Sequence, residues 1–561
     1  MLFKPLVLDF ITKYKTTFIF YVLLVVIFFP IEGIVLPKVY GKVFEQIKTT
    51  NMFPDIWNFG ENISKQNLPG MLSILVLVWI LIIGSGSVKH YLEATLVPEY
   101  FAHIREIIYE KTIYSQLNNF KDIKTGDYLS RVMELTRNIK DMFQYTITRL
   151  FPEMIVSIFI VGYLLMKNPL FGLISLVGFV LCMIVQIIGG MHVMDKVSEK
   201  EEYFNSNLSE NLQNSLDNLM NVYINNELDS EIKKNNNMEN MNTKMNKDVM
   251  NTQNLVIFLT QVITIGLYAL SILLLYSMFV NKKITTGEGI VVLLIIGQLV
   301  GYMLNVNSGL VHQVIYKMGI VRGSKDFLNE IFAEQHNGTR KDIIQKGDIQ
   351  FKNVKYRYDQ SSEDFLFDGL NMEIAGGKKI GLVGRSGSGK STLMKMLINL
   401  YKPEEGEILI DGVNIRDMDF QYLRENVNYI NQKTNLFDET VIYNMLYGND
   451  HVSEYELLQK LKQYKLFEVF SDLPDGVYAG AGIHGGNLSG GMQRITLLMR
   501  GILKPGKIMI LDEPLTGLDG DTRMKVMDMI LAETKDKTLI VITHDKEILP
   551  FMDRVIDINK L

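Results

Sequence analysis

The second half of the chain contains the sequence Gly384-Arg385-Ser386-Gly387-Ser388-Gly389-Lys390-Ser391-Thr392. It follows a strand-like run from Lys379 to Val383 and opens a helix-like run from Leu393 to Leu400. The glycines let consecutive backbone N–H groups point at one spot, and the start of the helix adds positive potential there. Lys390 can then reach the outer phosphates of a nucleotide, and the Ser391 hydroxyl can bind Mg²⁺. Because both flanking elements are in place, the pattern predicts a phosphate-binding loop and not a flexible Gly/Ser linker.

A second apolar run, Ile508 to Leu511, ends in two carboxylates, Asp512 and Glu513. A buried strand would deliver Asp512 beside the Mg²⁺ site, where it can hold a metal-bound water. Glu513 would then lie where it can polarise an attacking water. An apolar run with an acidic end is common by itself. Downstream of a phosphate-binding loop it indicates nucleotide hydrolysis.

The first half of the chain is built from long apolar runs. With 561 residues, of which 47% are hydrophobic, the chain is too long for one domain and unusually apolar for a soluble protein. A membrane-spanning helix needs about 20 apolar residues. Six runs are candidates for membrane spans: Thr17 to Leu36, Met71 to Val88, Phe151 to Met166, Leu170 to Val193, Leu255 to Val280 and Gly289 to Leu304. Between the third and fourth, Lys167-Asn168-Pro169 leaves room only for a tight hairpin. We expect the first run to be retained as a span, because no small-residue cleavage site follows it.

The loop charges predict an orientation. Lys and Arg gather before the first run and in the long loops Lys89 to Arg149 and Met194 to Gln253, so both chain ends are expected in the cytoplasm. Lysines in the first loop, Pro37 to Pro69, argue the other way, but an even number of spans requires that loop outside. Recurrent apolar positions predict that helices continue through the two long loops, with Asn235 to Asn246 as a polar helical face. A soluble α/β domain is predicted from about 345 onward.

Charge and cysteine content exclude other classes. The formal net charge of −5 provides no basic field for nucleic acid, so no nucleic-acid partner is expected. The single cysteine, Cys182, allows no intrachain disulfide and no cysteine cluster for a metal. Few ionisable residues interrupt the spans. For Glu32 and Glu153, which lie near span ends, we favour a structural role over a functional one. Polar residues such as Gln186 and Asn307 are expected to form helix-to-helix hydrogen bonds more often than to line a cavity.

A motif between the phosphate-binding loop and Asp512 identifies a family. Leu488-Ser489-Gly490-Gly491-Met492 resembles the signature motif of the ABC transporter ATPases. In that family Ser489, Gly490 and Gly491 would contact the γ-phosphate of ATP held by the opposite subunit. The remaining landmarks of the family follow in order: Tyr358 matches the aromatic residue that stacks on adenine, Gln432 the glutamine that links Mg²⁺ to the membrane domain, Asp519 the loop that crosses the dimer interface, and His544 the switch histidine near the γ-phosphate.

The resemblance covers about the whole chain, because six spans followed by one ATPase domain is the layout of the half-size exporters. It implies an all-α, six-helix membrane domain of the type IV exporter kind and a cytoplasmic α/β P-loop ATPase domain. The expected bounds are 1–325 for the membrane domain, 326–344 for a linker and 345–561 for the nucleotide-binding domain. Phe120 with Thr125 to Arg131, and Leu219 to Glu231, look like the loop tips that dock on the ATPase domains, the second on the partner's.

The resemblance further implies ATP and Mg²⁺ as cofactors and ATP-driven export as the function. Glu513 would be the general base, with His544 and Gln432 as further catalytic residues. Mg²⁺ would be bound by Ser391 and Gln432, and by Asp512 through water. The expected partners are a second half-transporter, as a homodimer in preference to a heterodimer, membrane lipid, and a transported hydrophobic or amphipathic molecule, lipid or peptide.

Two positions depart from the family pattern. Met492 stands where the signature usually has Gln, and Ile483 stands where exporters usually have an acidic residue. Ile483 puts in doubt one contact between the ATPase domain and the cytoplasmic loops. Three other functions stay open on the same resemblance: an importer, an ATP-gated channel or regulator, and a soluble-type ABC ATPase on a membrane anchor. The intact Glu513 and His544 argue against the channel, and six spans are more than an anchor needs.

Overall fold

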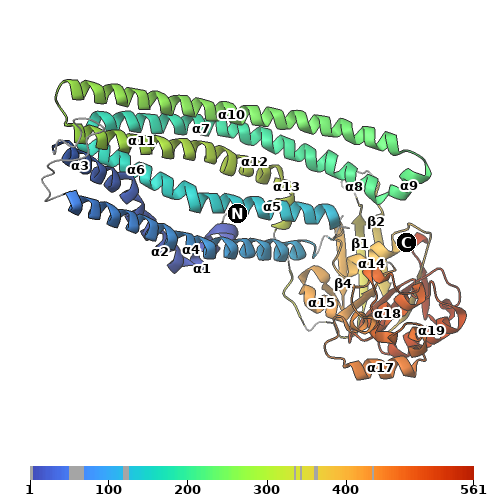
Figure 1. The fold of residues 1–561 in the computed structure, drawn as a ribbon. Helices are drawn as coiled ribbons and strands as arrows, with labels where there is room; N and C mark the ends of the chain where they lie inside the picture. The colour runs from blue at the N-terminus through green and yellow to red at the C-terminus, as the bar shows by residue number, and fades with distance from the viewer. Residues whose placement is uncertain are drawn as a thin grey trace. The chain divides into compact units, whose positions relative to one another are not determined.

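The computed structural model describes residues 4–49, 68–117, 120, 125–333, 337–341, 344–358, 364–432 and 435–560. They form two compact units. The first comprises Met1–Thr112 and Ile123–Ala333, and the second comprises Ile113–Asp122 and Glu334–Leu561. The described part of the first unit consists of helices and short turns, whereas both β-sheets lie in the second unit (Figure 1).

Six helical segments of the first unit are long and apolar enough to cross a membrane, which confirms the predicted number of spans. They are Lys15–Phe44, Gly70–Ser115, Tyr128–Lys167, Pro169–Asp217, Leu228–Val280 and Thr286–Gly323. The helices that build the unit are α1 (Asp9–Lys13), α2 (Lys15–Pro30), α3 (Leu36–Thr49), α4 (Leu68–Ser115), α5 (Thr125–Tyr145), α6 (Phe151–Lys167), α7 (Pro169–Tyr203), α8 (Glu210–Asp217), α9 (Leu219–Ile224), α10 (Leu228–Val280), α11 (Thr286–Gly309), α12 (Tyr316–Gly323) and α13 (Lys325–Ile331). Five π-helical turns interrupt or extend them: η1 (Lys4–Leu8), η2 (Ile31–Val35), η3 (Thr146–Leu150), η4 (Phe204–Ser209) and η5 (Leu310–Ile315).

The helices continue well past the apolar runs that predict them. Helix α10 runs unbroken from Leu228 to Val280, so the Asn-rich stretch is helical, as predicted. The prediction was wrong at the first span, because the chain stays helical beyond Leu36, through α3 to Thr49. Residues 50–67 of the predicted first loop and 121–124 of the first loop tip lie outside the described residues.

Helices α7, α10 and α11 lie side by side (Figure 1). Large apolar side chains cover the outside of the unit; Leu77, Ile80 and Ile83 on α4, for example, are each more than half exposed. Exposing so many apolar side chains to water is unfavourable, so we expect lipid or a partner chain to cover this surface. The tight hairpin predicted at Lys167 to Pro169 is confirmed, because α6 ends at Lys167 and α7 begins at Pro169. The Asn168 side chain caps α7 by accepting a hydrogen bond from the Leu170 N–H at 3.1 Å.

Polar side chains inside the helical unit bond to one another. Gln186 on α7 donates to Asn307 Oδ1 on α11 at 2.6 Å, and Asn307 reaches Thr264 Oγ1 on α10 at 3.5 Å. The predicted helix-to-helix use of Gln186 and Asn307 is therefore confirmed. Cys182 is buried beside them, with its Sγ 3.6 Å from the Thr260 carbonyl oxygen.

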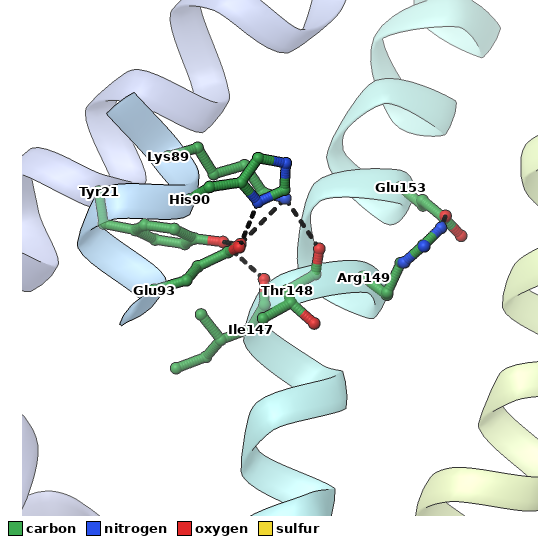
Figure 2. A network of polar contacts seen from close by, with 8 residues as sticks. All are labelled: Tyr21, Lys89, His90, Glu93, Ile147, Thr148, Arg149 and Glu153. Atoms are coloured by element: carbon green, nitrogen blue, oxygen red, sulfur yellow. Dashed lines mark hydrogen bonds and ion pairs between the residues drawn. The ribbon is translucent and has the colours of Figure 1, made fainter. Parts of the chain in front are cut away.

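A second polar network joins α2, α4 and the π-helical turn η3 (Figure 2). The Lys89 ammonium lies 2.9 Å from Glu93 Oε1 and donates to the Thr148 carbonyl at 3.0 Å. The Tyr21 hydroxyl donates to the Ile147 carbonyl at 2.6 Å and lies 3.1 Å from Glu93 Oε1. Lys89, Glu93 and Tyr21 are all buried. A π-helical turn shifts the helical hydrogen-bond pattern, and here two of its carbonyls bond to side chains of neighbouring helices.

Two sheets organise the second unit. An antiparallel sheet has the order β2-β1-β4-β5, and a parallel sheet has the order β6-β7-β8-β3-β9. The strands are β1 (Ile349–Tyr356), β2 (Phe367–Ile374), β3 (Lys379–Val383), β4 (Glu405–Ile410), β5 (Val413–Asn414), β6 (Val427–Ile430), β7 (Ile508–Asp512), β8 (Thr538–Ile542) and β9 (Arg554–Asp557). The helices are α14 (Lys390–Leu397), α15 (Phe420–Asn426), α16 (Val441–Leu446), α17 (Glu454–Gln463), α18 (Gly490–Ile502) and α19 (Gly520–Glu533). β7 and β8 are buried along their whole length, as central parallel strands covered on both faces are.

The parallel sheet brings the carboxyl ends of its strands to one edge, where ligands of such sheets bind. β3 lies between β8 and β9, and β7 lies between β6 and β8. The loop after β3 and the carboxylates after β7 therefore meet at that edge. The segment Ile113–Asp122 also belongs to this unit, and the Phe120 N–H donates to the Leu400 carbonyl at 3.0 Å.

Candidate active site

The loop after β3 has the backbone of a phosphate-binding loop. β3 ends at Val383, as the sequence predicted, and α14 begins at Lys390, three residues before the predicted start of the helical run at Leu393. Gly387 and Gly389 have φ values of 81° and 85°, which are left-handed and favour glycine. A Cβ on Gly389 would lie 2.5 Å from Phe367 Cζ, so no larger residue fits there.

Lys390 lies within the curl of this loop. Its side chain is buried, and its Nζ donates to the Gly384 carbonyl at 3.0 Å and the Arg385 carbonyl at 2.9 Å. Burial lowers the pKa of Lys390 below its ordinary value, while the nearby carboxylates of Glu513 and Asp512 act in the opposite direction. The loop therefore holds the Lys390 ammonium away from water. A phosphate oxygen could replace the two carbonyl oxygens as its hydrogen-bond acceptor.

The two carboxylates come from the end of β7. Asp512 is buried, and Glu513 follows with a φ of 50°, a left-handed conformation that is uncommon for glutamate. Strain of this kind concentrates at functional sites. The Glu513 carboxylate lies 3.5 Å from Thr543 Oγ1 and 3.9 Å from His544 Nε2, both of which follow β8. The predicted general base and the predicted switch histidine are therefore neighbours.

A cavity of about 410 Å³ lies between these groups. Its lining residues are Tyr358, Ser386, Gly387, Gly389, Lys390, Ser391, Thr392, Gln432, Asp512, Glu513, Ile542 and His544. Most of the predicted nucleotide-binding and catalytic residues thus share one cavity. Tyr358 is two-thirds exposed, and its hydroxyl contacts the Thr392 hydroxyl. An exposed aromatic ring at the rim of such a cavity can stack on a nucleobase.

Seven predicted residues lie outside that lining: Gly384, Arg385 and Ser388 of the loop itself, and Ser489, Gly490, Gly491 and Asp519 farther along the chain. Ser489 is the N-cap of α18 and accepts a hydrogen bond from the Met492 N–H at 3.3 Å. Asp519 is the N-cap of α19 and accepts from the Thr522 N–H at 2.9 Å; this bond holds the pKa of Asp519 below its ordinary value. A Cβ on Gly490 would meet nothing within 4 Å, so the start of α18 is open to a ligand or a partner.

The structure explains one departure from the family pattern and leaves the other at the surface. Met492 is buried in the core that packs α18 against α16 and β7, a place where an apolar side chain fits. Ile483 lies in a 3₁₀ turn and is 72% exposed. An apolar side chain so exposed on this unit is available for contact with another surface.

Sequence reasoning missed two residues that hold the ends of the strands. Arg494 on α18 is buried, and its guanidinium donates to the carbonyls of Asp512, Pro514 and Asn431. The Tyr429 hydroxyl on β6 donates to Asp512 Oδ2 at 3.1 Å. Burial, and then the Asp512 carboxylate, raise the pKa of Tyr429, so the phenol keeps its proton. Arg494 stands five residues after Ser489, and only that spacing from the signature could have drawn attention to it.

The donors in the cavity fit a magnesium–nucleotide complex. Ser391, Gln432 and Asp512 offer the hydroxyl, amide and carboxylate oxygens that Mg²⁺ prefers. Within the described ranges, no group of three His, Cys, Asp or Glu side chains could hold a metal ion by itself. Mg²⁺ is usually bound by one or two protein ligands together with substrate phosphates, which this cavity would allow. The buried Ser388 hydroxyl, which finds no hydrogen-bond partner among the described residues, adds a further free polar group in the loop.

Two family models match the chain. The ABC transporter transmembrane region matches residues 16–303, and the ABC transporter model matches residues 367–516. One solved structure, of a bacterial Atm1-family ABC exporter with ATP bound, has a TM-score of 0.80 over 97% of this chain and 93% of that chain, at 20% identity. At this level of identity, the likeness shows a shared fold and nothing further about the chain.

The curated relatives are similar over part of their length. The ATP-dependent lipid A-core flippase of Haemophilus influenzae (strain 86-028NP) is 35% identical over 231 residues, which are 41% of this chain and 39% of that protein. The protein of the same name from Saccharophagus degradans is 33% identical over 215 residues, 38% of this chain and 36% of that protein. ABC transporter B family member 2 of Dictyostelium discoideum is 35% identical over 199 residues, 36% of this chain and 14% of that protein. The chain therefore spans about two fifths or less of the curated relatives it matches.

Proposed function

Because this chain belongs to the ABC transporter family, we propose that it is a half-transporter that couples ATP hydrolysis to the export of a substrate across a membrane. One observation carries the proposal. Four residues, Lys390 of the phosphate-binding loop, Asp512, Glu513 and His544, line one cavity of about 410 Å³, and the same chain has six helices long enough to cross a membrane. The lysine, the carboxylates and the histidine are the groups that nucleotide hydrolysis needs.

A second copy would complete the site. Ser489, Gly490 and Gly491 lie outside the cavity of their own chain, at the open start of α18. A helix start with free N–H groups favours an anion. We infer a dimer in which the start of α18 in one copy faces the phosphate-binding loop of the other. All the catalytic positions are present in this chain, which supports a homodimer.

The chain's own residues divide the work of hydrolysis. The loop N–H groups and Lys390 bind the phosphates, with the lysine exchanging its carbonyl partners for phosphate oxygens. Ser391 and Gln432 would hold Mg²⁺ directly and Asp512 through a water; the metal, when bound, neutralises charge that develops on the phosphate oxygens. Glu513 accepts the proton of the attacking water at its carboxylate, and His544, 3.9 Å away, donates a hydrogen bond to the phosphate. The Tyr358 ring stacks on the base.

The membrane half would supply the pathway. The positive-inside pattern supports a cytoplasmic position for both chain ends and for the second unit. The relatives named lipid A-core flippases support an amphipathic, lipid-like substrate. The exposed apolar surface of α4 would face lipid or the partner chain. Closure of the ATPase dimer would be passed to the membrane helices through the tips at Phe120 and at α9.

The test is the steady-state Mg-ATPase rate of the purified chain in lipid nanodiscs, beside a Glu513→Gln variant. Gln keeps the size of the side chain but cannot accept the proton. We expect the variant to lose at least about a hundredfold in kcat and to bind ATP as tightly as the wild type. Equal rates in both would overturn the role of Glu513. Silence in both would show that an unlike partner chain or an obligatory substrate is missing.

A further inference from the structure

The Tyr429 hydroxyl lies beside one of the proposed metal ligands, Asp512. Tyr429 pairs with Ile510 in the parallel sheet, two residues before Asp512, so its long side chain reaches toward the carboxyl edge. Its hydroxyl donates to Asp512 Oδ2 at 3.1 Å, with Asn431 Oδ1 at 3.3 Å as the alternative acceptor. The phenol thus holds one oxygen of a carboxylate that lines the cavity.

The ring of Tyr429 is anchored independently of these bonds. It packs against the apolar core between the two sheets. The ring cannot swing away without leaving this packing, so the position of the hydroxyl is set by β6 and the core.

From this geometry we infer that Tyr429 is a positioning residue that orients the Asp512 carboxylate for the metal–nucleotide complex. The inference rests on the proposed function and deepens it. A hydrogen bond to one carboxylate oxygen fixes the torsion of the side chain and so fixes where the other oxygen points. Without the hydroxyl, Asp512 would have to be ordered when the metal binds. Partners that orient metal ligands in this way commonly change metal affinity by tenfold or more.

The sharpest variant is Tyr429→Phe, which removes one oxygen atom and keeps the ring. The matched control is Tyr464→Phe, because the Tyr464 hydroxyl also donates to a carboxylate of this unit, Glu533 Oε1 at 2.8 Å, but outside the cavity lining. Both variants are made in the full chain and purified in nanodiscs. ADP affinity is measured twice for each, in EDTA and with saturating Mn²⁺, and bound Mn²⁺ is followed by electron paramagnetic resonance.

We expect Tyr429→Phe to bind ADP in EDTA as tightly as the wild type does. The factor by which Mn²⁺ tightens ADP binding should be about tenfold smaller in the variant than in the wild type. In hydrolysis, the Mg²⁺ concentration for half-maximal rate should rise by the same factor while kcat at saturating Mg²⁺ changes less than about twofold. Tyr464→Phe should change neither quantity. The electron paramagnetic resonance lines of bound Mn²⁺ in the presence of ADP should also differ in width between Tyr429→Phe and the wild type, since the ligand field is less ordered in the variant.

Three outcomes in the variants would overturn the inference. An unchanged Mn²⁺ gain in Tyr429→Phe would show that the hydroxyl does not act on the metal site. Weaker ADP binding in EDTA would assign the effect to the shape of the loop. A deficit found only in Tyr429→Leu, where the ring is removed as well, would assign it to packing. A wild type that hydrolyses nothing but keeps the Mn²⁺ gain would count against the proposed function alone, and a wild type without ADP binding would overturn both.

Discussion

The Asp411 carboxylate accepts hydrogen bonds from the backbone N–H groups of Gln345, Lys346, Gly347 and Asp348, at 2.7 to 3.1 Å. It follows β4 and so ties the start of the second unit to the antiparallel sheet. Partial burial by itself would raise the pKa of Asp411, but the N–H donors outweigh it and lower the pKa on balance. At the scale of a residue, one ionised side chain supplies the hydrogen-bond acceptors that secondary structure would otherwise provide for these four backbone N–H groups.

Acid should loosen this attachment. Because the folded-state pKa lies below the unfolded value of about 3.9, the stabilisation is present above that value and is lost as the pH falls through the folded-state pKa. We expect the amide protection factors of residues 345–348 to fall between pH 5 and the acid limit of the fold, as measured by hydrogen exchange of the full chain.

Asp411→Asn provides the comparison. Asn can accept with one neutral oxygen, so protection of the same amides should already be about tenfold lower at pH 6. It should also change little with pH. A wild type whose protection is flat down to pH 3, or an Asn variant as protected as the wild type, would contradict the role of the charge.

At the scale of the element, the π-helical turn η3 accepts hydrogen bonds from Lys89 on α4 and Tyr21 on α2, and Lys89 forms a buried ion pair with Glu93 of its own helix (Figure 2). Removing one partner leaves the other charge buried and unpaired, which costs about 3–5 kcal/mol. We therefore expect Glu93→Gln and Lys89→Met each to lower the thermal midpoint of the purified chain strongly. The double variant Lys89→Met/Glu93→Leu should be less destabilised than either single one, because no charge remains.

The control for this cycle is His90→Ala. Its ring is largely exposed although it lies 3.0 Å from Glu93 Oε2, so its loss should shift the midpoint little. Additive effects of Lys89 and Glu93 in the double variant would show that the two residues act separately.

Strands and their motifs could be predicted well, and helix lengths could not. β3 matches its predicted bounds, and β7 extends one residue past its predicted end at Leu511, because short β-branched runs beside glycine loops have clear limits. Helix α10 begins at Leu228, 27 residues before the predicted span at Leu255; its continuation through the long loop was predicted, but its first residue was not. The π-helical turns have no sequence signal, because they arise from packing between helices.

The same limit applies to the site. Residues that touch a ligand directly carry a motif, as Lys390, Glu513 and His544 do, and the structure places them in one cavity. Tyr429 and Arg494 act through contacts between strands and helices that are far apart in the chain. Their importance depends on the register of β6 against β7 and on the packing of α18, which no local pattern encodes.

At the scale of the whole molecule, the open start of α18 predicts that two chains share each site. A Ser489→Arg chain should be inactive alone, because the bulky cation blocks the helix start, and a Glu513→Gln chain should be inactive alone. A mixed dimer has one site with both defects and one with neither. A one-to-one mixture should therefore recover about a quarter of the wild-type ATPase rate if the sites act independently.

Copurification through two different tags is the control that mixed dimers form. Activity of Ser489→Arg alone would contradict a role for the start of α18 in hydrolysis. No recovery in a copurified mixed dimer would contradict independent sites.

The burial of Cys182 has a practical consequence for measuring how the two copies move during the transport cycle. It is the only cysteine of the chain and is 2% exposed, with its Sγ against the Thr260 carbonyl. Maleimide reagents should therefore leave the native chain unlabelled. A cysteine introduced at any exposed position would then take a spin label or fluorophore alone, without replacing Cys182. The native sequence is thus ready for distance spectroscopy between two copies during the transport cycle.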